Sequence, residues 1–348
     1  MSNDGPILSV CIPTYNRARL LESALHSLAP QLEKMGGEVE LVISDNCSPD
    51  HTPQLVSDFT ARCKHVRGFR NETNLGVIKN IQLCIQRAQG EFVWMLGDDD
   101  LVREDALERL LGVIKANPDV DFVFANVSLR MIDERERFDR CVSGADFPDL
   151  APALSKDFSE RILESWNELI DPAIDGTYLT SVMVSVFRRS VCLEAVSTPD
   201  FEDQFCTSLF TSCPHPIMFA RTMVGRKAFF LGRPIAIAFG GHWEWSDYIS
   251  SIWVVRLNQL LDLYLASGIE KWRIDKCRRA LLFRTGGHVF RLLLNRRLPG
   301  RELFSFRRHI ARYWRFKELW IGLFAVPIYS SLRRRLPRPR VRPGSRTR

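Results

Sequence analysis

Two hydrophobic periodicities alternate along the first 130 residues of this 348-residue chain. Short apolar runs typical of buried strands occupy 7–12, 38–44, 65–69, 91–96 and 121–129. Between them, apolar positions recur at helical spacing over 19–34, 50–63, 76–89 and 104–116. Strands that alternate with helices of this length predict right-handed βαβ units. We therefore expect an α/β domain with a mainly parallel sheet flanked by helices.

The pattern changes after residue 130. We expect loops with one helix near 157–170, then strands at 181–187, 217–224 and 227–231. Helical spacing returns over 249–267, 270–295 and 301–325. This division predicts an α/β domain over 1–245, a helical basic region over 246–336 and a disordered basic tail over 337–348.

The charge of the chain is divided by position. The formal net charge is +7, with 48 Lys/Arg against 41 Asp/Glu. Residues 1–270 hold 25 Lys/Arg and 38 Asp/Glu, a net of −13, whereas 271–348 hold 23 and 3, a net of +20. A strongly basic C-terminal end predicts an anionic partner, either a nucleic acid or a membrane surface.

The spacing of the cysteines and the hydropathy of the chain indicate the cellular compartment in which we expect the protein. The nine cysteines include no Cys-x-x-Cys pair, and several lie inside apolar runs, so we expect free thiols in a reducing cytosol rather than a disulfide framework or zinc site. The N-terminus does not resemble a signal peptide. No apolar run is long enough to predict a transmembrane helix.

Polar segments follow four of the expected strands, at 13–17, 45–50, 71–76 and 97–100. In a parallel sheet these segments meet at one edge, where ligands bind. Each is also compatible with an ordinary turn between a strand and a helix. Their convergence on one edge favours a binding site.

Three consecutive carboxylates, Asp98, Asp99 and Asp100, follow the strand at 91–96. Adjacent carboxylates repel one another, and a hard divalent cation relieves that conflict. Since Mg²⁺ is often held by one or two carboxylates together with substrate phosphates, the cluster indicates a metal-bound pyrophosphate. The alternative is a solvated acidic turn before the helix at 104. Asp45 is equally compatible with contact to a base or ribose and with capping of the helix at 50.

The four segments read Ile-Pro-Thr-Tyr-Asn-Arg at 12–17, Ser-Asp-Asn-Cys-Ser-Pro-Asp at 44–50, Asn-Leu-Gly at 74–76 and Gly-Asp-Asp-Asp at 97–100. In order and spacing they resemble family 2 glycosyltransferases, including the branch of bacterial abequosyltransferases and other O-antigen or capsule enzymes. The resemblance covers roughly 7–130. It implies the GT-A fold, a nucleotide-diphosphosugar-binding α/β fold, here followed by a helical C-terminal extension.

The resemblance also implies roles by position. Asp45 would bind the base, Asp98 the ribose or sugar, and Asp100 a Mn²⁺ or Mg²⁺ ion. Asn46 departs from the family, because many relatives have a second acid there. The residues implied to contact the nucleotide are Pro13, Thr14, Tyr15, Asn16, Asp45, Asn74, Gly76 and Asp98.

The resemblance implies an inverting mechanism, in which a carboxylate takes the proton of the acceptor hydroxyl. Asp203 is the favoured base and Glu202 the second choice, with Asp175 a further candidate. Acids at 202 and 203 are also common at a helix N-terminus without any catalytic role. Residues 240–245, with His242 between Gly241 and Trp243, resemble the segment that covers the donor in related enzymes.

The basic tail interleaves aromatic and cationic residues over 303–332. This pattern favours an interfacial helix on an anionic leaflet, and the alternative is a helical subdomain with a solvated basic face. A nucleic-acid-binding protein is a competing interpretation, although no reading motif supports it and it leaves Asp98 to Asp100 unexplained. A sugar nucleotidyltransferase is another, but 13–19 lack a glycine- and lysine-rich phosphate loop.

We therefore expect a metal-dependent glycosyltransferase of surface polysaccharide biosynthesis. Its partners would be a nucleotide-diphosphate sugar donor and a saccharide or polyprenyl-linked acceptor, not a nucleic acid. It would be cytoplasmic and peripheral on the inner face of the cell membrane. The sequence does not predict the sugar, the linkage or the oligomeric state.

Overall fold

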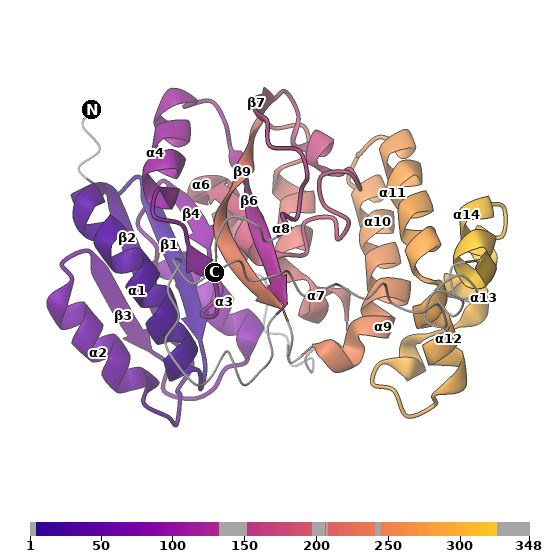
Figure 1. Ribbon diagram of the computed structural model, residues 1–348, viewed down its shortest axis with the longest axis horizontal. Helices are drawn as coiled ribbons and strands as arrows, with labels where there is room; N and C mark the ends of the chain where they lie inside the picture. The colour runs from indigo at the N-terminus through magenta and orange to yellow at the C-terminus, as the bar shows by residue number, and fades with distance from the viewer. Residues whose placement is uncertain (1–4, 132–151, 197–205, 207, 241–244, 326–348) are drawn as a thin grey trace, which may run out of the picture. The chain divides into compact units, whose positions relative to one another are not determined.

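The computed structural model describes residues 5–131, 152–196, 206, 208–240 and 245–325. These residues divide into two compact units (Figure 1). The first comprises the chain up to Ser246 together with Gln259–Cys277, and the second comprises Asp247–Asn258 and the chain from Arg278 onward. No helix among the described residues is both long and apolar enough to cross a membrane.

The first unit is built on a mixed sheet with the strand order β3-β2-β1-β4-β8-β6-β9-β5, and β7 also pairs with β9. The strands from β3 to β4 run parallel, while β8 is antiparallel to both β4 and β6. The strands are β1 (Leu8–Thr14), β2 (Val39–Asp45), β3 (Val66–Arg70), β4 (Phe92–Met95), β5 (Leu101–Val102), β6 (Phe122–Met131), β7 (Glu160–Leu163), β8 (Ser185–Arg188) and β9 (Ala228–Gly240).

Helices cover both faces of this sheet (Figure 1). On one face lie α1 (Ala18–Met35), α2 (Thr52–Arg62) and α4 (Ala106–Ala116). On the other lie α3 (Val77–Arg87), α6 (Arg189–Val196) and α8 (Pro214–Thr222), the last preceded by the short α7 (Leu209–Ser212). β1 and β2 are buried almost throughout, because both faces of the sheet are covered. The α/β fold expected from the alternating periodicity is confirmed.

Two segments of the first unit differ from the pattern prediction. The apolar run at 217–224 lies in helix α8, whose first turn accommodates Pro214 and Pro216 and whose residues Ile217 to Ala220 are buried. A short apolar run does not distinguish a buried helix from a strand. The helix expected near 157–170 is instead strand β7 followed by a single 3₁₀ turn, Trp166–Leu169.

The second unit is helical. It contains α9 (Ile249–Ser251), a π-helical turn at Ile252–Arg256, α12 (Gly286–Leu294), α13 (Phe306–His309) and α14 (Lys317–Trp320). α10 (Leu257–Ala266) and α11 (Lys271–Arg284) each contribute residues to both units. The expected helix over 301–325 is a series of short turns instead, because its buried residues do not lie on one helical face.

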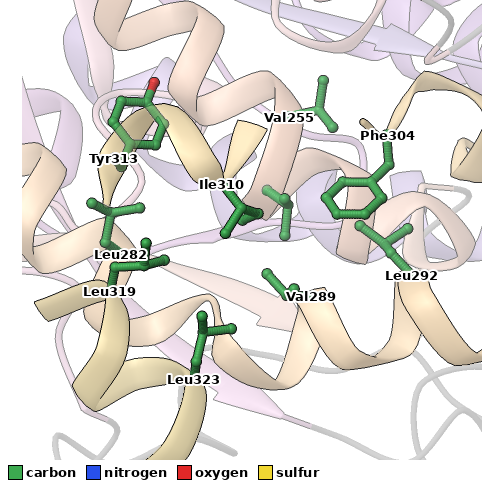
Figure 2. Close-up of a cluster of buried hydrophobic side chains, with 10 residues drawn as sticks. Val255, Leu282, Val289, Leu292, Phe304, Ile310, Tyr313, Leu319 and Leu323 are labelled. Carbon is green, nitrogen blue, oxygen red and sulfur yellow. The ribbon is translucent and has the colours of Figure 1, made fainter. Parts of the chain in front are cut away.

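Figure 2 shows the side chains of that core, in which Ile310 points into the middle of the group. The core consists of Val254, Val255, Leu282, Val289, Leu292, Phe304, Ile310, Tyr313, Leu319 and Leu323, and Phe316 packs against it. The second unit therefore folds around its own apolar cluster.

Candidate functional site

A cavity of about 450 Å³ opens beside the carboxyl end of β1, in the range of small-molecule sites. Six of the eight residues expected to contact a nucleotide line it, and four other residues join them. The lining is Pro13, Thr14, Tyr15, Arg17, Asn46, Asn74, Gly76, Val77, Asn80 and Asp98. The convergence expected at this sheet edge is therefore present in the structure.

Asp98 lies in the wall of the cavity and is 5% exposed. Its Oδ2 accepts a hydrogen bond from the Thr14 hydroxyl at 2.8 Å, and its Oδ1 accepts one from Arg17 Nη1 at 3.0 Å. Burial raises the pKa of Asp98 to about 6; Asp99 raises it too, whereas the Arg17 guanidinium opposes the shift. Asp98 is thus an oriented acceptor that is mostly ionised at neutral pH.

Asp100 is 1% exposed and does not line the cavity. Its Oδ2 accepts a hydrogen bond from the Gly97 amide at 3.0 Å, which closes the turn between β4 and β5. A Cβ at Gly97 would stand 2.7 Å from both Asp99 Oδ1 and Asp100 Oδ2. A side chain at position 97 would therefore force one of these carboxylates to move from its present position.

Asp45 ends β2 and is 1% exposed. Its Oδ1 accepts a hydrogen bond from the Ser48 amide at 3.0 Å, while Arg70 Nε lies 3.4 Å from Oδ2. That second oxygen accepts no hydrogen bond from the described residues. Asp45 therefore has the local turn contact expected of a structural aspartate and also an oxygen available to accept a further hydrogen bond.

Asn16 and Gly76 have backbone conformations with positive φ, of 54° and 79°. The Asn16 amide donates to Ser48 Oγ at 2.8 Å, which joins the loop after β1 to the loop after β2. Gly76 immediately precedes α3, where its φ favours glycine over any other residue. Asn16 is exposed and does not line the cavity, whereas Gly76 does.

A network of side-chain amides fixes the loop between β3 and α3. Asn46 Nδ2 donates to Asn74 Oδ1 at 2.7 Å, and Asn46 Oδ1 accepts from the Leu75 amide and from Asn71 Nδ2, each at 3.0 Å. Asn74 Oδ1 also accepts from the Gly76 amide at 2.9 Å. Asn46 therefore ties the end of β2 to both ends of this loop.

Asn80 extends the network from the first turns of α3. Its Oδ1 accepts from Ser44 Oγ at 2.7 Å and from Asn71 Nδ2 at 3.1 Å, and its Nδ2 donates to the Ser44 carbonyl at 2.8 Å. Sequence reasoning did not assign Arg17, Asn46 or Asn80 to the site. Asn80 could have been found from the sequence, because it is a polar residue on the otherwise apolar face of helix α3.

Of the three carboxylates considered as acceptors of the hydroxyl proton, the structure describes only Asp175. Glu202 and Asp203 lie outside the described residues, as do His242 and Trp243. Asp175 is fully buried; its Oδ1 accepts from both the amide and the hydroxyl of Thr177, and its Oδ2 accepts from the Leu179 amide at 2.7 Å. These contacts give Asp175 a local role in a turn.

A second cavity, of about 240 Å³, lies elsewhere in the first unit. Its charged lining residues pair with neighbouring groups, as Arg161 does with Asp157 at 2.8 Å and Asp171 with Lys276 at 2.5 Å. None of the residues expected to bind a nucleotide lines it. The larger cavity is therefore the candidate site.

The residues that build the larger cavity lie within a match to a known family. Residues 9–170 match the family described as Glycosyl transferase family 2. These residues are a family 2 glycosyltransferase domain. The resemblance stated from the four motifs is confirmed.

Two named relatives are similar in sequence to part of this chain. The abequosyltransferase RfbV of Salmonella typhimurium is 34% identical over 115 residues, which cover 33% of this chain and 34% of the relative. The GalNAc(5)-diNAcBac-PP-undecaprenol beta-1,3-glucosyltransferase of Campylobacter jejuni is 31% identical over 187 residues, 53% of each chain. The chain thus matches between about a third and about half of the length of these relatives.

Solved structures show that the fold around the family 2 domain is GT-A. S. aureus TarS in complex with UDP-GlcNAc superposes with a TM-score of 0.52 at 18% identity, over 85% of this chain and 75% of that one. The Pyrobaculum calidifontis mannosyltransferase PcManGT in complex with GDP-Man and Mn²⁺ has a TM-score of 0.50 at 16% identity, over 95% and 87%. The expected fold, with a helical C-terminal region, is confirmed.

Proposed function

We propose that the chain transfers a sugar from a nucleotide-diphosphate donor to a hydroxyl of a saccharide or lipid-linked saccharide in surface polysaccharide biosynthesis. The observation that carries the proposal is the cavity at the carboxyl end of β1, with Asp98 held in its wall by Thr14 and Arg17. The names of both relatives describe sugar transfer, and that of the Campylobacter enzyme includes an undecaprenol-linked acceptor.

The donor would bind along the loops that follow β1, β2 and β4. Asp98 would accept hydrogen bonds from a ribose or sugar hydroxyl, since its two oxygens are already oriented by neighbouring donors. Asp45 Oδ2, which accepts no hydrogen bond from the described residues, would accept one from a base N–H. Pro13, Tyr15, Asn74 and Gly76 would enclose the nucleoside.

We propose that a divalent cation binds at the carboxylates that follow β4. Within the described residues no group of three or more His, Cys, Asp or Glu side chains is arranged to hold a metal ion. Mg²⁺ usually takes only one or two protein carboxylates, and substrate phosphates complete its oxygen ligands. Asp100, with Asp99 beside it, would supply that share, and the bound Mn²⁺ or Mg²⁺ would offset the charge that builds on the departing diphosphate.

The sugar would be transferred with inversion of its anomeric configuration. The acceptor oxygen forms a bond to the anomeric carbon on the face opposite the nucleotide, the bond from that carbon to the diphosphate oxygen breaks, and the hydroxyl proton passes to a carboxylate. We assign that carboxylate to Asp203, with Glu202 as the alternative. Asp175 is disfavoured, because both of its oxygens already accept hydrogen bonds within its own turn.

Thr14 offers a direct test of the proposed donor site. Replacing Thr14 with Val keeps the shape of the side chain but removes the hydrogen bond to Asp98. The variant should bind its nucleoside diphosphate several-fold more weakly than the wild type, because Asp98 loses one of its two orienting donors. Thermal shift with UDP, GDP and dTDP in the presence of Mn²⁺ measures this through ligand stabilisation of the folded state.

Thr60→Val is the matched control, because the Thr60 hydroxyl donates only to the Ser57 carbonyl on the exposed side of α2. It should leave the nucleotide-induced shift unchanged. Equal shifts for Thr14→Val and Thr60→Val, or no shift with any of the three nucleotides, would contradict the assignment. Exchange of pyrophosphate into the donor would favour the nucleotidyltransferase instead.

We also propose that the enzyme works at the inner face of the cell membrane, where polyprenyl-linked saccharides are presented. The net charge of +20 over 271–348 supports this location, since the cytosolic leaflet is anionic. The undecaprenol-linked acceptor in the name of one relative supports it as well.

A further inference from the structure

The second unit carries a group of exposed aromatic side chains that its core does not use. Trp314, Trp320 and Phe324 are 58%, 45% and 56% exposed. Each directly follows a residue of the core shown in Figure 2, namely Tyr313, Leu319 and Leu323. Because the preceding residue is buried in each case, the fold turns these three aromatic side chains outward. Below, the three are called the outer aromatic group.

Contacts within the chain hold the outer aromatic group together. The Trp320 and Phe324 rings stack with their centroids 6.2 Å apart and their planes 3° from parallel. Trp320 Nε1 donates to the Trp314 carbonyl at 2.8 Å. The indole N–H of Trp320 is thus satisfied within the protein, so its ring can enter an apolar phase without an unpaired donor.

Two glycines fix the segment that carries Trp320 and Phe324. A Cβ at Gly322 would stand 2.5 Å from the Leu282 carbonyl and 2.7 Å from the Phe283 carbonyl. A Cβ at Gly286 would come closer still to the Gly322 carbonyl oxygen and would stand 2.5 Å from the Gly322 carbonyl carbon. This approach of two backbones seats residues 320–324 against the end of α11 and the start of α12. The outer aromatic group therefore stands on a rigid support and not on a free helix.

The charge of the unit that carries this group is predominantly positive. The described residues of the second unit contain 13 Lys/Arg and 3 Asp/Glu, a net of +10. Arg307, Arg308, Arg312, Arg315 and Lys317 are all exposed. The Arg315 guanidinium lies 5.2 Å from the centre of the Trp314 ring. Exposed tryptophans beside arginines suit the boundary between lipid headgroups and acyl chains, where one partner is anionic and the other apolar.

We infer that Trp314, Trp320 and Phe324 form the membrane-docking surface of this chain, with an anionic phospholipid leaflet as its partner. Phe304 and Tyr313, which the sequence pattern placed among the interfacial aromatic residues, belong to the core instead. The membrane would thus be contacted by three aromatic rings on the surface of a folded unit. The inference concerns this surface alone and does not depend on which sugar is transferred, or on whether transfer occurs.

Co-sedimentation of the full chain with vesicles of phosphatidylglycerol and phosphatidylethanolamine tests the inference. The variant is Trp314→Ala/Trp320→Ala/Phe324→Ala, which keeps every charge, including those of the basic tail beyond residue 325. At low salt, where electrostatic attraction persists, the variant should lose part of its binding. At high salt, where that attraction is screened, its partition should fall by roughly tenfold or more while the wild type stays bound.

Trp272→Ala is the matched control. Trp272 is 59% exposed and has an arginine over its ring, Arg273 at 4.4 Å, but it belongs to the first unit. This variant should sediment like the wild type, and circular dichroism and thermal unfolding should show the triple variant folded. Nucleotide-induced thermal shift reports separately on the proposed donor site and should be unchanged in both.

Wild-type-like sedimentation of the triple variant at high salt would overturn the inference. So would equal loss of binding in Trp272→Ala, or, at low salt, wild-type binding to neutral phosphatidylcholine vesicles as strong as to anionic ones. Retention on single-stranded DNA that depends on the same three rings would assign the surface to a nucleic acid instead.

Discussion

Some side chains of the candidate site could be predicted from the sequence, and others could not. The sheet edge that carries Thr14, Asn74, Gly76 and Asp98 was predicted because the carboxyl ends of parallel strands meet there, and the family resemblance singled out these residues. The role of Asn46 was not predictable. It depends on which atoms of the 71–76 loop come within reach, and turn composition does not specify that. The acid expected at this position in relatives would lack the amide donor that Asn74 receives here.

Asn46→Asp tests the amide network. Asn74 Oδ1 is committed as an acceptor for the Gly76 amide, so a carboxylate at 46 would face it as a second acceptor. We expect the KM for the donor to rise about tenfold with kcat nearly unchanged, because the loop that encloses the nucleoside loses its tie to β2. Steady-state kinetics with varied donor provides the measurement.

Asn74→Ser should rescue that variant. A serine hydroxyl can accept from the Gly76 amide and at the same time donate to a carboxylate at 46. The double variant Asn46→Asp/Asn74→Ser should therefore recover most of the donor KM. An unchanged KM in Asn46→Asp, or a double variant impaired as much as the single one, would show that Asn46 does not position the loop.

Whole elements show where hydrophobic pattern suffices and where it does not. The amphipathic helices α1, α3 and α4 were predicted because each has one apolar face toward the sheet. Helix α8 was not predicted, because its consecutive buried residues lack the alternation of apolar and polar faces that reveals the helical period. The prediction of one helix over 301–325 failed for a different reason: the buried residues Phe304, Ile310, Tyr313, Leu319 and Leu323 do not share one helical face.

Helix α8 also contains a buried group with consequences for stability. His215 Nε2 is enclosed and has no hydrogen-bond partner among the described residues. Burial lowers the pKa of His215 from 6.5 to about 4, although the backbone at Leu179 and Thr180 opposes the shift. The folded state therefore prefers the neutral ring. The stability it contributes is present above pH 6.5 and is lost as the pH falls toward 4.

His215→Gln should flatten this dependence. The wild type should lose several degrees of Tm more than the variant between pH 6.5 and pH 4.5. In the wild type the His215 ring is neutral while buried and binds a proton once unfolding exposes it, which favours the unfolded state as the pH falls. Thermal melts across this range make the comparison, with the exposed His51→Gln as control. Parallel Tm curves for the wild type and His215→Gln would refute the buried titration.

At the scale of the whole molecule, the split of charge and the division into units coincide in part. The basic excess predicted from the sequence falls largely on the second unit, whose described residues hold 13 Lys/Arg against 3 Asp/Glu. The boundary is less simple than a cut near residue 246, because Gln259–Cys277 returns to the first unit. That return depends on tertiary contacts, such as the hydrogen bond from the Tyr264 hydroxyl to the Tyr178 carbonyl, which no local pattern encodes.

The central claim is that this chain transfers sugar, and its most direct test is a coupled measurement of donor cleavage and acceptor glycosylation. With the nucleotide sugar identified by thermal shift, a lipid-linked saccharide acceptor and Mn²⁺ or Mg²⁺, the wild type should release one nucleoside diphosphate per glycosylated acceptor. NMR should show an inverted anomeric configuration, and a chelator should stop turnover. Asp203→Asn should bind the donor normally yet lower kcat by about a hundredfold or more.

Pyrophosphate release, retention of the anomeric configuration, or full turnover in the presence of a chelator would each contradict a specific part of this account. Failure to glycosylate any acceptor hydroxyl with the donor that binds would contradict the central claim itself.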